Sequence, residues 1–171
     1  NNGQILDMLY ESRHITEKEY LRMVEQKTAN LFKASAVIGA ILAKADEEQI
    51  ILIETYALNI GIAFQLKDDL LDLRDEKGRE AGTDIKKGKK TLLITKAIEK
   101  ATAEQKKILF GIFGKESASK EEISNLTKII EDAGAIRYVN DLAKNKIAEA
   151  KRLIDSLENK YELISLAELI E

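Results

Sequence analysis

The chain lacks cysteine and proline altogether, and aromatic residues make up only 5% of its 171 positions. Without cysteine it has no disulfide framework, no thiolate metal site and no cysteine nucleophile. The absence of cysteine also fits a reducing compartment, and we expect a cytoplasmic protein. Alanine, leucine, isoleucine, lysine and glutamate dominate the sequence, and this composition favours helices.

Long hydrophobic runs and an excess of positive charge are missing as well. The longest apolar stretch, residues 34–43, is interrupted by Ser35 and Gly39 and has half of the roughly 20 residues that cross a bilayer. We therefore expect no transmembrane segment, and we see no signal peptide at the start of the chain. The net charge of −3 argues against nucleic acid as a partner.

Helical patterns fill almost the whole length of the chain. Thr16 followed by Glu19 is a capping-box signature and predicts a helix that runs to about Lys44. Asp46 can cap a second helix, which runs to roughly Glu76 and is apolar almost all round its middle, as buried helices are. Further helices are expected at residues 91–100, 103–113, 120–133, 135–157 and 161–170, with a polar loop at residues 78–90. The length is too short for two domains, so residues 1–171 are predicted to form a single all-α domain, a multi-helix bundle.

An acidic cluster lies in the most apolar of these helices. Asp68 and Asp72 are four residues apart and share one helix face, with Asp69 beside them, and Gln65 and Gly61 continue the polar line. Carboxylates that lie close together repel one another, and burying them unpaired is costly. A hard divalent cation removes both problems, and Mg²⁺ completed by water and phosphate oxygens suits such a site. The alternative is a solvated face near the end of a helix.

The loop after the acidic cluster is basic and rich in glycine. Its glycines permit close approach of the backbone to a ligand. Acidic ligands followed by a flexible basic loop are what a metal-bound polyphosphate requires, whereas the alternative is an exposed loop of mixed charge. The basic residues of the loop are Arg79, Lys86, Lys87, Lys89 and Lys90.

Like the acidic cluster, two polar residues interrupt an apolar helix face, here in the first long helix. Lys27 and Thr28 fill the position where the stripe calls for an apolar residue, and a lysine rarely belongs there unless it is paired. Lys27 either extends to the surface or faces the same cavity as Asp68 and offers its charge to a phosphate. The single histidine, His14, has no acid or nucleophile pattern around it and is assigned no role. The stripe consists of Tyr20, Val24, Leu31, Ile38 and Leu42.

These elements, in this order, resemble the trans-isoprenyl (polyprenyl) diphosphate synthases. Any one matching string is weak, but the ordered set covers essentially the whole chain and is specific. The strings are Gly3-Gln4 with Asp7, Tyr20-Leu21 with Lys27-Thr28 and Leu31-Phe32, residues 64–72, Gly82-Thr83-Asp84, Gly88-Lys89 with Thr91-Leu92, and Gly134-Ala135-Ile136 with Tyr138.

The resemblance implies an all-α prenyltransferase fold around a central cavity. There an allylic prenyl diphosphate ionises, and the double bond of isopentenyl diphosphate attacks the carbocation. By position, Asp68, Asp69 and Asp72 match the family's second aspartate-rich motif, which binds Mg²⁺ against the allylic diphosphate. The family is dimeric, so the resemblance also implies a homodimer.

The same comparison by position gives roles to several other residues. Lys27 and Lys89 match lysines that hold the allylic diphosphate. Thr28 and Gln65 match polar residues that line the developing carbocation. Arg79 stands where many relatives have a lysine, so the charge for binding diphosphate is kept and the geometry changes.

A second departure from the family pattern is more serious than the arginine at position 79. The first aspartate-rich motif, which would precede Gly3-Gln4, is missing, together with the basic residues that bind isopentenyl diphosphate. The chain also begins at Asn1 rather than methionine, so we expect the C-terminal part of a synthase, inactive alone and dependent on an N-terminal segment. Two alternatives are a non-catalytic subunit of a heteromeric prenyl synthase and a helical interaction module. The acidic cluster in a buried helix argues against the module.

Overall fold

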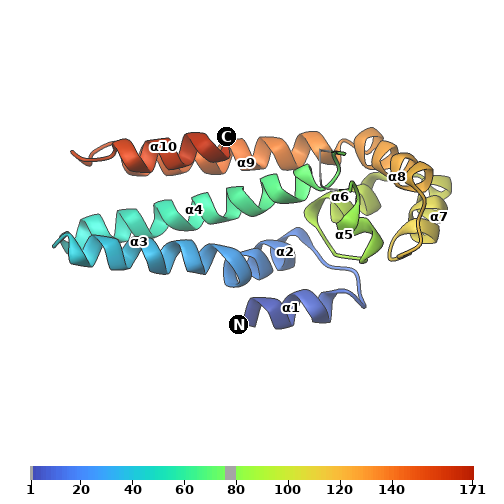
Figure 1. Cartoon of the computed structure of the whole chain (residues 1–171), viewed down its shortest axis with the longest axis horizontal. Coiled ribbons are helices and arrows are strands. Elements are labelled where there is room, and N and C mark those ends of the chain that lie inside the picture. The colour runs from blue at the N-terminus through green and yellow to red at the C-terminus, as the bar shows by residue number, and fades with distance from the viewer. Residues whose placement is uncertain (1, 76–79) are drawn as a thin grey trace. The chain divides into compact units, whose positions relative to one another are not determined.

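The structure is a computed structural model that describes residues 2–75 and 80–171. The described residues form helices and connecting turns without a strand, which confirms the all-α prediction (Figure 1). In chain order the helices are α1 (Asn2–Tyr10), α2 (Glu17–Val24), the π-helix η1 (Glu25–Ala29), α3 (Asn30–Leu42), α4 (Glu47–Leu71), α5 (Thr83–Lys86), α6 (Leu92–Lys100), α7 (Ala103–Ile112), α8 (Lys120–Asp132), α9 (Ala135–Leu153) and α10 (Tyr161–Ile170).

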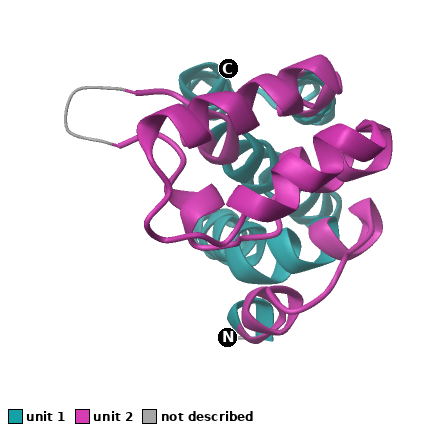
Figure 2. Cartoon of the chain, turned by 90° about the vertical axis from the view of Figure 1, so that its right-hand side faces the viewer, with its two compact units in different colours: residues 1–4, 21–67, 141–171 teal, residues 5–20, 68–140 magenta. Residues whose placement is uncertain are grey.

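The residues group into two compact units (Figure 2). Unit 1 comprises Asn1–Gln4, Leu21–Lys67 and Asp141–Glu171, and unit 2 comprises Ile5–Tyr20 and Asp68–Asn140. The prediction of a single domain stays a prediction.

Two helix starts follow from caps that were readable in the sequence. The Thr16 N–H donates to the Glu19 carboxylate at 2.8 Å, and the Glu19 N–H donates to the Thr16 hydroxyl at 3.3 Å. Before α4, the Gln49 N–H donates to the Asp46 carboxylate at 2.8 Å. Each cap satisfies backbone donors that the first helical turn leaves unpaired.

The bounds of the later helices agree with the prediction to within two residues, with two differences. Helix α9 ends at Leu153 rather than residue 157, and α4 ends at Leu71 rather than near Glu76. A short helix, α5, also forms inside the segment that was predicted as a loop.

In unit 1, α4 is packed against α9 and α10. The hydroxyl of the buried Tyr56 donates to the Leu163 carbonyl of α10 at 2.5 Å. Burial of each large aliphatic side chain contributes about 1.5–3 kcal/mol, so this core is the main source of stability for the unit. Its buried members are Tyr56, Ala57, Ile60 and Ala63 of α4, Ile147 and Ala150 of α9, Ile154 just after α9, and Ala167 of α10.

By length and composition α4 could also cross a membrane, which the sequence analysis did not expect. The indication is weak, because the core helix of a soluble protein meets the same criteria. The packing of α4 against α9 and α10 fits such a core helix.

In unit 2, α8 packs against both α6 and α7. Helix α6 buries three consecutive apolar side chains, and α8 starts at the Ser119–Glu122 capping box. The fully buried large side chains of the unit include Tyr20, Leu92, Leu93, Ile94, Leu109, Leu126 and Ile130.

The π-helix η1 interrupts the apolar stripe that the sequence shows as continuous. Tyr20 and Val24, before η1, are buried, whereas Leu31 and Leu42, after it, are 70% and 78% exposed. A π-turn holds an extra residue, and one residue rotates a helix by about 100°. The side chains that follow η1 therefore face a different direction from the one an uninterrupted helix would give.

Two glycines allow other helices to approach the η1 segment closely. A Cβ on Gly3 would lie 2.2 Å from the backbone nitrogen of Lys27, and a Cβ on Gly61 would lie 2.5 Å from the Cα of Ala29. Backbone atoms cannot move aside as the end of a flexible side chain can. Helices α1 and α4 therefore reach η1 only because these two positions have no side chain.

We expect Gly61→Ala to lower the free energy of unfolding by about 1–3 kcal/mol, as overpacking of a filled core does. The matched control is Gly39→Ala in α3, where a Cβ meets nothing within 4 Å. That change should be neutral or stabilising by up to about 1 kcal/mol, because alanine is the better helix former. Chemical denaturation followed by circular dichroism measures both values, and equal effects at the two positions would contradict the packing argument.

Candidate functional site

The acidic cluster lies where α4 ends. Asp68 and Asp69 belong to the last turn of α4, and Asp72 follows directly, with its N–H donating to the Asp68 carbonyl at 3.1 Å. Asp68 is half-buried, whereas Asp69 and Asp72 are only 4% and 2% exposed. All three belong to unit 2.

Asp69 is held by a tyrosine that sequence analysis gave no role. The Tyr20 hydroxyl donates to Oδ2 of Asp69 at 2.6 Å, and Tyr20 is 1% exposed. Burial, and then the charge of Asp69, raise the pKa of Tyr20 well above its ordinary value. The phenol therefore stays protonated and acts as a donor to the carboxylate.

Asp72 anchors the segment that contains α5. Its Oδ2 accepts from the Asp84 N–H at 2.9 Å, and its carbonyl accepts from the Gly82 N–H at 2.7 Å. Gly82 has a φ of 76°, and a Cβ there would lie 2.5 Å from a methyl carbon of Ile123. Asp72 thus supplies the start of α5 with a side-chain acceptor, which Gly82 as the N-cap does not have.

The anchored segment presents Lys89 next to the acidic residues. Lys89 Nζ lies 2.7 Å from Oδ1 of Asp84. Partial burial alone would lower the pKa of Lys89, but the bond to Asp84 and the charges of Asp84, Asp7 and Asp69 outweigh it and raise that pKa. Lys89 is therefore a cation held among several carboxylates.

The donor set permits a bound divalent cation but does not form a complete cage for one. Among the residues that the structure describes, no three Asp, Glu or His side chains converge as a metal site. In Asp69 and in Asp72, Oδ2 accepts a hydrogen bond from the protein. Since Mg²⁺ is usually held by one or two carboxylates, with water and substrate phosphates completing its shell, the arrangement suits a cation that arrives with a diphosphate.

In unit 1 the structure brings together the two residues predicted to line the carbocation. The Thr28 hydroxyl donates to Oε1 of Gln65 at 2.8 Å. Thr28 and Lys27 both lie in η1, and π-turns are frequent at functional sites. Lys27 is half-buried. Because it belongs to unit 1 and Asp68 to unit 2, the prediction that both face one cavity stays a prediction.

Arg79 and His14 are the two remaining residues that the sequence analysis singled out. Arg79, predicted to bind diphosphate, lies outside the described residues. His14 is exposed, and its ring meets Phe110 edge-on at 5.7 Å between centroids.

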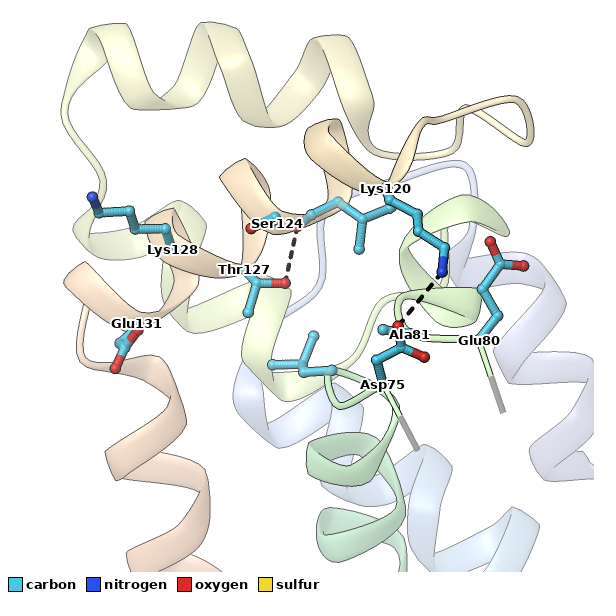
Figure 3. A pocket seen from close by; sticks show the side chains of 10 residues that line it. Asp75, Glu80, Ala81, Lys120, Ser124, Thr127, Lys128 and Glu131 are labelled. Atoms are coloured by element: carbon cyan, nitrogen blue, oxygen red, sulfur yellow. Dashed lines mark hydrogen bonds and ion pairs between the residues drawn. The ribbon is translucent and has the colours of Figure 1, made fainter. Parts of the chain in front are cut away.

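Of the predicted site residues that the structure describes, none lines a cavity of about 480 Å³ in unit 2 (Figure 3). Lys120 reaches toward Asp75 across it at 3.6 Å, while Lys128 points away toward the opposite end. Side chains of both charges line the cavity together with the apolar Leu73, Ala81 and Ile123. The cavity therefore does not select a ligand of one charge. Its lining consists of Leu73, Asp75, Glu80, Ala81, Lys120, Ile123, Ser124, Thr127, Lys128 and Glu131.

The sequence model of the family described as polyprenyl synthetase matches residues 1–130. The chain belongs to this family. The match confirms the resemblance to trans-isoprenyl diphosphate synthases that the ordered motifs indicated. A geranylgeranyl diphosphate synthase of Sulfolobus acidocaldarius is 44% identical over 163 residues, which cover 92% of this chain and 48% of the relative.

Solved structures agree with the assignment to the polyprenyl synthetase family. The crystal structure of a geranylgeranyl pyrophosphate synthetase from Pyrococcus horikoshii matches with a TM-score of 0.91 at 36% identity, covering 99% of this chain and 53% of that one. A geranylgeranyl pyrophosphate synthase from Corynebacterium glutamicum, complexed with isoprenyl diphosphate and magnesium, matches with a TM-score of 0.89 at 28% identity, covering 99% and 49%. The chain thus spans about half the length of the relatives it matches.

Sequence reasoning missed the contacts of Tyr20 and Asp84. Tyr20 was placed in an apolar stripe, although a buried tyrosine hydroxyl usually needs a partner. Asp84 was part of a matching string but was given no role. The signal that could have found both is the same: a polar group in a buried setting has to be paired.

We expect Asp72→Ala to loosen the segment that holds Lys89. Loss of a hydrogen bond to a charged acceptor costs about 1.5–3 kcal/mol, so the Asp84 amide should exchange with deuterium at least about tenfold faster. Asp75→Ala is the control, because Asp75 is exposed and makes only a weak ion pair with Lys120. Hydrogen exchange followed by NMR tests this, and equal exchange in both variants would rule out the anchor.

Proposed function

We propose that this chain supplies the second aspartate-rich site of a head-to-tail prenyl transfer, in which isopentenyl diphosphate is joined to an allylic prenyl diphosphate. The observation that supports this most directly is the pairing within unit 2 of an acidic cluster with an anchored lysine, Lys89. In the proposal, Asp68, Asp69 and Asp72 hold Mg²⁺, and Lys89, Lys27 and Arg79 hold the diphosphate. The relative crystallised with magnesium and isoprenyl diphosphate supports this choice of ligands.

The chemistry starts with cleavage of the allylic carbon–oxygen bond, whose electron pair leaves with the diphosphate. Mg²⁺ at the acidic cluster would neutralise the charge that develops on that group. Lys89 and Lys27 add fixed positive charge, which acts most strongly where water is excluded. The Gln65 carbonyl oxygen and the Thr28 hydroxyl would face the allylic carbocation. The double bond of isopentenyl diphosphate then forms the new carbon–carbon bond, and the departed diphosphate takes the proton.

The proposed function requires protein partners for this chain. Four apolar side chains of α3 are more than half exposed, namely Leu31, Ile38, Ile41 and Leu42. Large apolar side chains exposed on one helix are typical of an interface. We propose a homodimer that works with an N-terminal segment carrying the first aspartate-rich motif. A cytoplasmic location belongs to the same proposal and is supported only by the absence of cysteine.

We expect the chain to bind Mg²⁺ tightly only when diphosphate is present. Calorimetry with inorganic diphosphate, with and without Mg²⁺, measures this directly. Asp68→Ala should weaken Mg²⁺-dependent binding at least about tenfold, because Asp68 is the most accessible carboxylate of the cluster. Asp75→Ala, three residues beyond the cluster, should bind as the wild type does. Tight Mg²⁺ binding without diphosphate, unchanged in Asp68→Ala, would contradict the proposed site.

Turnover tests the whole proposal. We expect the isolated chain to show none with labelled isopentenyl diphosphate and an allylic primer. A chimera in which this chain replaces the matching half of the Sulfolobus acidocaldarius relative should be active. Asp68→Ala in the chimera should lower its rate about 10²–10³-fold, as loss of a preorganised stabilising group does.

The controls separate the proposed function from its alternative. Asp75→Ala in the chimera should keep the rate. An inactive chimera, made from a chain that still binds Mg²⁺ and diphosphate, would favour a non-catalytic subunit. Turnover by the isolated chain that is lost in Asp68→Ala would show that no other acidic motif is required.

A further inference from the structure

The hydroxyl of Tyr20 has no part in the function proposed above, yet it makes one of the shortest contacts of the acidic cluster. A phenylalanine would fill the same apolar space and would avoid burying a polar group. The hydroxyl is buried and lies 2.6 Å from Oδ2 of Asp69. Its reason for being there is therefore the carboxylate.

We propose that Tyr20 is a positioning residue, whose hydroxyl holds the Asp69 carboxylate in the orientation in which the cluster binds a divalent cation together with diphosphate. The inference rests on the proposed function. In this role Tyr20 does not contact substrate and takes no part in proton transfer. It acts only through Asp69.

The charge of the donor explains why a tyrosine suits this place. A lysine or arginine at position 20 would also bind Asp69, but it would cancel the negative charge that attracts the cation. A neutral phenol fixes the carboxylate and leaves its charge in place. The bond also engages one oxygen of Asp69, and a carboxylate has about four acceptor positions in all.

The surroundings of Asp69 make its orientation matter. The charges of Asp68 and Asp84 act on Tyr20 as that of Asp69 does, and Asp69 also acts on Lys89. A rotation of the Asp69 carboxylate would therefore change the electrostatic field at Lys89 and at Tyr20 together. Groups that orient the ligands of a metal typically contribute 10–100-fold to its affinity.

Unit 1 provides a matched control in Tyr56. Like Tyr20 it is 1% exposed, and its hydroxyl also donates a short hydrogen bond, at 2.5 Å, but to the Leu163 carbonyl. Tyr20→Phe and Tyr56→Phe thus remove the same atom from residues of equal exposure, although the bond of Tyr56 is only partly buried. Only the first removes a bond to the acidic cluster.

The test is calorimetric titration of inorganic diphosphate into the full 171-residue chain at saturating Mg²⁺, with thermal melts of every variant. We expect Tyr20→Phe to weaken binding about 10–100-fold and Tyr56→Phe to leave it within about twofold of the wild type. Both variants should stay folded at the assay temperature, with Tyr20→Phe losing more melting temperature because its hydrogen bond has a charged acceptor. In an Asp69→Ala background Tyr20→Phe should add no further loss, because coupled residues are not additive.

The outcomes are distinguishable. Wild-type affinity in Tyr20→Phe would overturn the inference, and so would equal losses of affinity in Tyr20→Phe and Tyr56→Phe, since both would then reflect stability alone. Additive losses in the double variant would show that Tyr20 does not act through Asp69. If Asp69→Ala fails to fold, the comparison of the two single tyrosine variants decides. Absence of Mg²⁺-dependent diphosphate binding in the wild type would instead refute the proposed function, and the inference with it.

Discussion

The burial of carboxylates at the C-terminal end of α4 is the constraint on which the rest of unit 2 depends. The last carbonyls of a helix already concentrate negative charge, and a basic residue there usually offsets it. The last turn of α4 has none and places Asp68 and Asp69 there instead. Two of the three carboxylates are almost fully buried, where an unpaired charge is costly. This end of α4 is therefore unfavourable unless donors or a cation compensate.

Two neutral donors take part in this compensation. Asp69 receives a phenol and Asp72 receives a backbone amide, and neither donor carries a charge. The nearby lysine, Lys89, forms an ion pair with Asp84 at 2.7 Å. The bonds from Tyr20 and from the Asp84 amide pair buried carboxylate oxygens without adding a positive charge. A carboxylate held by a neutral donor keeps more of its attraction for a cation than one held by a lysine.

Much of the fold could be predicted because its signals are local. The caps at Thr16 and Asp46 and the glycine-marked breaks depend on residues a few positions apart, so the helix bounds followed from them. The family could be recognised because its strings keep their order along the chain. Asp68, Asp69 and Asp72 were found by their spacing. They were expected inside a long apolar helix running to about Glu76, whereas α4 ends at Leu71, just before Asp72.

What could not be predicted depends on contacts between distant residues. Helix α4 stops at Leu71 because Asp72 turns to bind Gly82 and Asp84, ten and more positions further on. The same contacts allow α5 to form where glycines and lysines predict a loop. The partner of Tyr20 lies 49 residues away, and no periodic pattern indicates it.

The π-turn at η1 shows how one such contact changes the meaning of a sequence pattern. Gly3 and Gly61 closely approach the backbone of residues 26–29 in this turn, and neither contact is local. Once the extra residue is inserted, Lys27 and Thr28 no longer interrupt a single stripe. They lie between two stripes of different direction, one that is buried and one that carries the exposed Leu31 and Leu42. The polar pair is therefore better understood as the point where the helix changes register than as a fault in its core. Within this turn the Thr28 hydroxyl donates to Oε1 of Gln65, so the hydroxyl that departs from the apolar pattern has a partner on α4.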